Sequence, residues 1–173
     1  MNPGDVHVRP ITLADVAGYR SCVGAVMGER KFLAYLEPFS FAQTATFVAE
    51  NIENGNPHFV AEDSGQVVGW CDVRRESVPT YRHDGLLGMG LLPVYRGRGL
   101  GERLMRTTLD AARGAGFERI SLSVYAQNTR AMALYRKVGF VLEGTRVRGR
   151  KVDDAYDDVH MMAYFFDAEA PSP

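Results

Sequence analysis

The chain has 173 residues, and its 46% hydrophobic and 24% charged content is close to the average of soluble globular proteins. This length predicts a single domain, which we place at residues 6–165, with a disordered C-terminal tail over residues 166–173. Lys and Arg total 20 against 21 for Asp and Glu, so the formal net charge is −1. Such a balance argues against binding to nucleic acid or to an anionic membrane through bulk charge.

The cysteines and the N-terminal residues exclude further classes of protein. Cys22 and Cys71 are the only cysteines and lie far apart, which excludes a disulfide scaffold and a zinc ribbon. The first ten residues lack the basic and apolar regions of a signal peptide, and no apolar run approaches membrane-spanning length. We therefore expect a reduced, cytoplasmic protein without a membrane segment.

The first half of the chain predicts two helices and three strands. The expected helices begin at Thr12, with Leu13, Val16, Tyr19 and Val23 as the apolar stripe, and at the capping box Ser40–Gln43, ending near Gly55. Alternation predicts strands over 6–10, 58–62 and 67–73, the last two joined by a hairpin turn at Asp63-Ser64-Gly65.

The second half alternates strands with helices. The expected strands cover 85–92, 119–124, 140–147 and 158–165, and the expected helices cover 99–115 and 128–138. The order β-α-α-β-β-β-α-β-α-β-β predicts a mixed α/β fold in which helices cover a mixed sheet.

The stretch from Leu91 to Gly101 is the most informative, because a buried strand runs through Pro93 and a glycine-rich turn into an amphipathic helix. Glycines at 97, 99 and 101 let the main chain approach a ligand closely, and the first helical turn offers unpaired N–H groups to phosphate oxygens. Arg96 and Arg98 add positive charge for a polyanion.

Two nucleotide signatures fail in this stretch. A nucleoside-triphosphatase loop requires Gly-Lys-Ser/Thr at its end, whereas this loop ends Gly99-Leu100-Gly101. The Gly88-Met89-Gly90 string lies inside a strand and is followed by Pro93 where a dinucleotide fingerprint requires its last glycine.

Two segments resemble the GNAT N-acetyltransferases. Arg96-x-x-Gly99-x-Gly101 is similar to that family's R/Q-x-x-G-x-G/A motif, and Asn128 to Phe140 looks like its N-x-x-A-x-x-x-Y-x-x-x-G-F segment. Both occur in the family's order within a matching order of elements from about Val6 to Tyr164. The resemblance implies a GNAT-like, mostly antiparallel mixed sheet of six to seven strands flanked by about four helices.

The resemblance also implies acetyl-CoA as co-substrate and an amine as acceptor. By position, the main chain of Arg96, Gly97, Arg98, Gly99, Leu100 and Gly101 would hold the pyrophosphate, while Leu91 and Leu92 would pair with the pantetheine amides. The implied reaction is direct attack of a primary amine, on a small molecule or a protein N-terminus, on the acetyl group in a ternary complex. The alternative is a non-catalytic acyl-CoA-binding module of the same fold, and a homodimer is compatible with either.

Asn128 and Tyr135 each have two interpretations. They can be a helix N-cap and a core aromatic, or, as the resemblance implies, a cofactor contact and the general acid that protonates the departing thiolate. A phenol, with a reference pKa of about 10, keeps its proton at neutral pH and can donate it. We expect the catalytic role for Tyr135 and leave both roles open for Asn128.

The general base is not identified by the sequence. Many relatives carry a glutamate on or near the strand before the phosphate loop, whereas residues 85–92 contain no acid. Asp72, His83 and Asp84 remain as candidates that could act through a water, although each is commonly a solvated strand-end residue.

Three other features are expected to carry no chemistry of their own. Cys71 has no activating base nearby in sequence and is expected in the core. The acidic residues at 153–158 with His160 follow a basic run, which predicts a solvated hairpin with cross-strand pairs and no metal site. The patch Phe32, Tyr35, Leu36, Phe39 and Phe41 is expected to be mostly core, with some side chains shaping the acceptor pocket.

Overall fold

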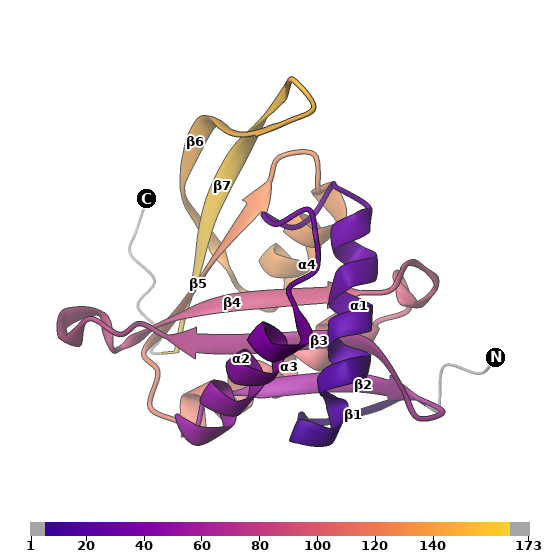
Figure 1. Ribbon diagram of the computed structural model, residues 1–173. Coiled ribbons are helices and arrows are strands. Elements are labelled where there is room, and N and C mark those ends of the chain that lie inside the picture. Colours follow the sequence, from indigo (N-terminus) through magenta and orange to yellow (C-terminus); the bar gives the residue numbers. More distant parts are fainter. Residues whose placement is uncertain (1–5, 167–173) are drawn as a thin grey trace.

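The protein is built on one seven-stranded sheet in the order β1-β2-β3-β4-β5-β7-β6 (Figure 1). The computed structural model describes residues 6–166, so residues 167–173 of the predicted tail lie outside the described residues. The strands are β1 (His7–Pro10), β2 (His58–Asp63), β3 (Gln66–Arg75), β4 (Asp84–Leu91), β5 (Arg119–Tyr125), β6 (Val141–Val152) and β7 (Ala155–Phe165). All neighbours are antiparallel except β4 and β5, which confirms the predicted mixed, mostly antiparallel sheet.

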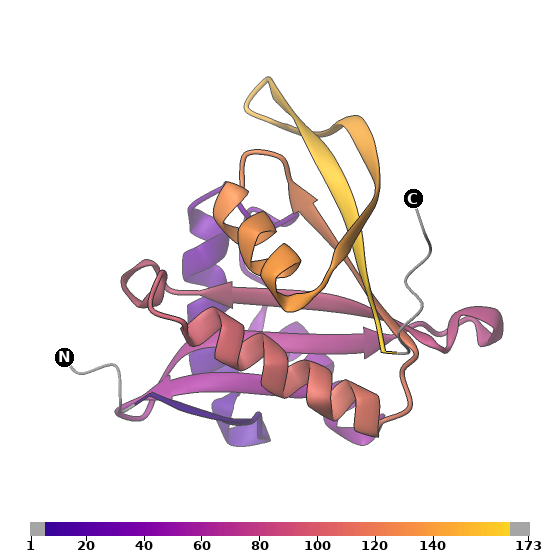
Figure 2. The ribbon, with the colours of Figure 1, turned by 180° about the vertical axis from the view of Figure 1, so that it is seen from behind.

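Four α-helices cover the two faces of the sheet. Helices α1 (Val16–Gly28) and α2 (Phe41–Glu53) lie on one face, while α3 (Leu100–Gly114) and α4 (Thr129–Val138) lie on the other (Figures 1 and 2). Each face has its own apolar core, centred on Val48, Val60 and Trp70 under α1 and α2, and on Leu104, Met105 and Ile120 under α3.

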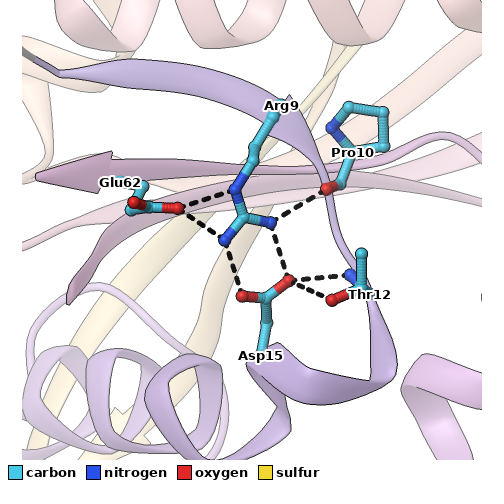
Figure 3. Close-up of polar contacts among 5 residues, drawn as sticks. All are labelled: Arg9, Pro10, Thr12, Asp15 and Glu62. Carbon is cyan, nitrogen blue, oxygen red and sulfur yellow. Dashed lines mark hydrogen bonds and ion pairs between the residues drawn. The ribbon is translucent and has the colours of Figure 1, made fainter. Parts of the chain in front are cut away.

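A polar cluster holds the entry into α1 (Figure 3). The Arg9 guanidinium donates to Glu62 Oε2 at 2.7 Å and to both carboxylate oxygens of Asp15. The bonds from Arg9 to Asp15 lower the pKa of Asp15 to about 2. Asp15 also accepts from the Thr12 N–H at 2.8 Å, and the two residues form a capping box at the start of this segment. The expected place of Leu13 on the apolar stripe is wrong: it is 62% exposed, because residues 13–15 form a 3₁₀ turn and α1 begins at Val16.

Both predicted hairpins are present. Ser64 and Gly65 have φ values of 50° and 80° between β2 and β3, as a two-residue turn requires. Strands β6 and β7 are longer than predicted and meet at Asp153 and Asp154, with Arg150 opposite Asp157 on the neighbouring strand. Within residues 6–166 no three Asp, Glu, His or Cys side chains are grouped as metal ligands would be.

None of the helices formed by the described residues is both long enough and apolar enough to cross a membrane.

Candidate active site

Strands β4 and β5 diverge and open a gap in the middle of the sheet. They pair only at Asp84–Arg119, Gly85–Ile120 and Leu86–Ser121, and β5 then turns away from β4 (Figure 1). The Leu92 N–H donates to the Val68 carbonyl of β3, so alternation along the ladder directs the main-chain groups of Met89 and Leu91 toward the gap. This edge of β4 can therefore add an extended ligand, although the N–H of Leu92, named from the sequence, is already used by β3.

The loop after β4 forms a cradle of main-chain donors. Gly97 and Gly99 have φ values of 75° and 78°, a conformation that favours glycine, and Gly99 is the N-cap of α3. Among the described residues, no acceptor pairs with the N–H groups of residues 97–102. Six free donors at a helix N-terminus fit the diphosphate of a coenzyme A thioester.

Two side chains anchor this loop to the rest of the fold. The Tyr95 hydroxyl donates to Asp63 Oδ2 at 2.6 Å, at the β2–β3 turn. The Arg96 guanidinium donates to both carboxylate oxygens of Glu29 and, through Nε at 2.8 Å, to the Leu91 carbonyl. It also lies 4.9 Å from the centre of the Phe32 ring.

The two loop arginines therefore differ. The expectation that both side chains meet phosphate is revised for Arg96, whose guanidinium is engaged by Glu29 at the end of α1. Arg98 is exposed, and within the described part of the chain its side chain makes no hydrogen bond or ion pair. Arg98 thus keeps its charge available to a ligand.

The two sequence motifs meet in space where α3 begins. A Cβ added at buried Gly101 would lie 3.3 Å from Leu134 Cδ2 and 3.4 Å from Leu91 Cδ1, so α3 approaches both α4 and β4 closely. The Asn128 Oδ1 accepts from the Ala131 N–H at 3.2 Å, so its side chain is the N-cap of α4.

Tyr135 follows Leu134 on α4 and is only 8% exposed. Its ring packs against Phe140, with ring centres 5.8 Å apart. Burial, and secondarily the nearby Cys71, raises the pKa of its phenol, which keeps the proton in place at neutral pH. Cys71 is fully buried, as predicted, and burial raises the pKa of its thiol, so it is unsuited to act as a nucleophile.

On the opposite face of the sheet lies a cavity of about 500 Å³ between α1, α2 and the edge of β4. Its aromatic lining consists of Tyr19, Tyr35, Phe39, Phe47 and Trp70. The lining reaches β4 at Gly88 and Met89, where the gap between β4 and β5 has already opened, so the cavity and the gap adjoin. The predicted core patch at 32–41 is partly wrong, since Tyr35 and Phe41 are 62% and 57% exposed; Tyr35 and Phe39 line this cavity instead.

Asp72 on β3 lies between cavity residues and is buried without a partner. It is 7% exposed, and it makes no hydrogen bond or ion pair with another described residue. It lies opposite Gly88, where an added Cβ would be 3.3 Å from Asp72 Oδ1, so the missing side chain leaves room for this carboxylate. Burial raises the pKa of Asp72 to about 7, the range that suits a general base.

Asp84 and His83 lie at the wrong end of β4. Asp84 starts the strand and is paired with Arg119 at 3.1 Å, seven residues and about 23 Å from Leu91. Exposed His83 precedes it. Of the three acids and bases considered from the sequence, Asp72 alone lies beside the cavity.

Comparison with known proteins supplies the decisive observation. The family model described as "Acetyltransferase (GNAT) family" matches residues 27–140. The chain is 37% identical over 115 residues to the N-alpha-acetyltransferase RimI of Mycobacterium tuberculosis, covering 65% of this chain and 70% of that protein. This chain belongs to the GNAT acetyltransferase family. It is therefore an acetyl-CoA-dependent N-acetyltransferase, with acetyl-CoA as co-substrate.

Solved GNAT structures share the fold over nearly the whole chain. The Salmonella typhimurium acetyltransferase yncA, solved with acetyl-CoA, superposes with a TM-score of 0.90 at 19% identity and covers 98% of this chain and 99% of that chain. A GNAT phosphinothricin acetyltransferase from Sinorhizobium meliloti, also in complex with acetyl-CoA, has a TM-score of 0.88 at 22% identity, covering 97% and 94%.

Proposed function

We propose that this GNAT enzyme transfers the acetyl group of acetyl-CoA to a primary amine by direct attack while both substrates are bound. The observation that carries the proposal is the junction of two separate sites at β4: the gap with its phosphate cradle on one side and the aromatic cavity on the other. An acetyl group at the end of a pantetheine arm in the gap would face an amine in the cavity.

Main-chain groups and Arg98 would hold the co-substrate. The free N–H groups of residues 97–102 would bind the pyrophosphate, and Arg98 would add an ion pair to a phosphate. The N–H of Leu91 and the main chain of Met89 would pair with the pantetheine amides. Acetyl-CoA supplies the thioester whose carbonyl carbon accepts the amine.

Two side chains on opposite faces of the sheet would move the protons. Asp72, directly or through a water, would take a proton from the ammonium so that the free amine forms the new C–N bond. The Tyr135 hydroxyl would donate a proton to the thiolate released when the C–S bond breaks. As the tetrahedral intermediate collapses, the nitrogen loses a second proton, which returns the Tyr135 phenolate to its neutral form, and the proton held by Asp72 leaves to solvent. The products are then an acetamide, coenzyme A thiol and one released proton.

The test is release of coenzyme A thiol from acetyl-CoA in the presence of a panel of primary amines, including small molecules and peptides with free N-termini. The proposal predicts thiol release that depends on the amine and yields one equivalent of acetamide. Binding of acetyl-CoA without release for any amine would favour a non-catalytic acyl-CoA-binding module. Cytoplasmic location and pairing of two copies remain predictions, to be tested by fractionation and by sedimentation.

A further inference from the structure

The charges around the aromatic cavity point to the chemical class of the acceptor. We propose that the acceptor is a small primary amine that carries an anionic group, such as a carboxylate, and an apolar body, and that Arg74 binds the anionic group. This inference rests on the proposed function, because it assumes that the cavity receives the acceptor.

The described residues that line the cavity include two arginines, Arg20 and Arg74, and neither Asp nor Glu. Arg20 already donates through Nε to the Phe39 carbonyl at 2.7 Å. Arg74 is exposed, and no other residue in the range 6–166 accepts a hydrogen bond or ion pair from its guanidinium. Its neighbour Arg75, on the other face of β3, donates to the carbonyls of Arg82 and Ala115.

Arg74 also has a defined position relative to Asp72. The two residues are two apart on β3, so they share one face of the sheet at about 7 Å along the strand. An amine placed near Asp72 and Gly88 would have its anionic group on the side of Arg74. The apolar body would then contact the aromatic lining contributed by α1, α2 and the segment between them.

The same arrangement disfavours polycationic acceptors. Each ammonium beyond the reacting one would face arginines in a lining that, among the described residues, holds no carboxylate. A cavity of about 500 Å³ is large enough for a molecule of amino-acid size. A neutral or anionic amine of this size is thus favoured over polyamines and aminoglycosides.

Binding can be measured without turnover, because Trp70 is the only tryptophan of the chain, is 3% exposed and lines the cavity. The protein, with coenzyme A present, is titrated with N-acetyl-leucine, N-acetyl-methionine or N-acetyl-phenylalanine, and separately with the uncharged amide of each. Binding is followed by the fluorescence of Trp70. We expect at least one acid to bind roughly 10- to 100-fold more tightly than its amide, the range of a charge-assisted hydrogen bond. Arg74→Gln should abolish this preference.

The matched control is Arg82→Gln, which removes an exposed arginine that does not line the cavity. This variant should keep the preference for the acid. In turnover, leucine, leucinamide and isopentylamine are compared by kcat/KM, and Arg74→Glu should shift the preference from the acid toward the amide.

Four results would overturn the acceptor assignment. They are equal binding of acid and amide, no binding of any pair, the same effect of Arg74→Gln and Arg82→Gln, and acetylation that is confined to peptides and independent of Arg74. Binding that is selective for the acid and depends on Arg74, but without thiol release from any amine, would support the anion site and overturn the proposed acetyl transfer.

Discussion

The two faces of the sheet form their sites in different ways. On the side of α3, the cradle consists of main-chain groups, namely six N–H groups from one short segment. Glycine occupies the two positions of this segment that have positive φ, 97 and 99. On the side of α1 and α2, the cavity is made of side chains from two helices, two strands and the segment between the helices. The character of the cradle therefore depends on the backbone of one segment, whereas the character of the cavity depends on individual side chains.

The largest effect is expected from a side chain in the cradle. Gly99→Glu places a carboxylate where the pyrophosphate would bind, at a φ of 78°, so acetyl-CoA binding should fall below detection by calorimetry. Gly116→Glu is the matched control, since Gly116 has a φ of 77° and open space at the far end of α3. If the two variants bind acetyl-CoA equally well, the cradle is misassigned.

Removal of the Tyr135 hydroxyl tests the α4 side of the site. Tyr135→Phe keeps the ring against Phe140, so binding of acetyl-CoA should change little, while kcat should fall roughly 10²- to 10⁴-fold. Tyr164→Phe, whose ring packs on the same Phe140, is the control and should keep full kcat. A Tyr135→Phe variant with wild-type kcat would show that this residue only fills the core.

The Asp72 carboxylate tests the opposite face. Because its pKa is raised to about 7 by burial, kcat/KM should rise with pH up to about 7 and level off above it. Asp72→Asn should lower kcat/KM roughly 10²-fold and remove this rise, while Asp84→Asn should keep it. A wild-type rise that persists in Asp72→Asn would assign the base to another group.

Stability gives an independent measurement of the same carboxylate. Because the folded pKa of Asp72 exceeds the unfolded value of about 3.9, the native state binds the extra proton, and this group lowers stability as pH rises from about 4 to about 7. His58 lies opposite Asp72 in the register of β2 and β3, and burial lowers its pKa to about 4. This histidine therefore raises stability as pH rises from about 4 to about 6.5. In chemical denaturation, Asp72→Asn should gain stability relative to wild type between these pH values; a constant difference would contradict the raised pKa.

The smallest effects separate the two loop arginines. Arg98→Ala should weaken coenzyme A binding by about 1.5 to 3 kcal/mol and make it less sensitive to salt, because one ion pair to phosphate is lost. Arg96→Ala should instead lower the thermal stability of the free protein, since it leaves Glu29 unpaired and releases the loop from α1. Calorimetry and thermal unfolding of both variants decide; equal loss of stability in both would contradict the distinction.

The cradle could be predicted from the sequence because its ligand groups are contiguous. Gly97, Gly99 and Gly101 specify the backbone, and the order of elements places them after a buried strand. The role of Arg96 could not be predicted in this way, because its partner Glu29 is 67 residues away and belongs to a different helix.

The cavity was harder to predict, because its residues come from segments that are distant in the sequence. The glycines at 88 and 90 form a decoy nucleotide motif, yet the structure shows that they make room for Asp72 and Trp70 of β3; a Cβ at Gly90 would approach the Trp70 ring to 2.3 Å. Recognising this requires the register between β3 and β4, which no local pattern contains. Hydrophobicity alone likewise does not distinguish a core from a lined cavity, so it places the aromatic residues at 32–41 in the core.

The proposed acetyl transfer requires both faces of the sheet to be occupied at the same time. Initial rates of coenzyme A release test this directly, when the concentrations of acetyl-CoA and of a free amine that the enzyme acetylates are varied together. Direct transfer predicts intersecting double-reciprocal lines and, with acetyl-CoA alone, a protein whose intact mass is unchanged. Parallel lines together with a mass increase of one acetyl group would show an acetyl-enzyme intermediate and contradict direct transfer across β4.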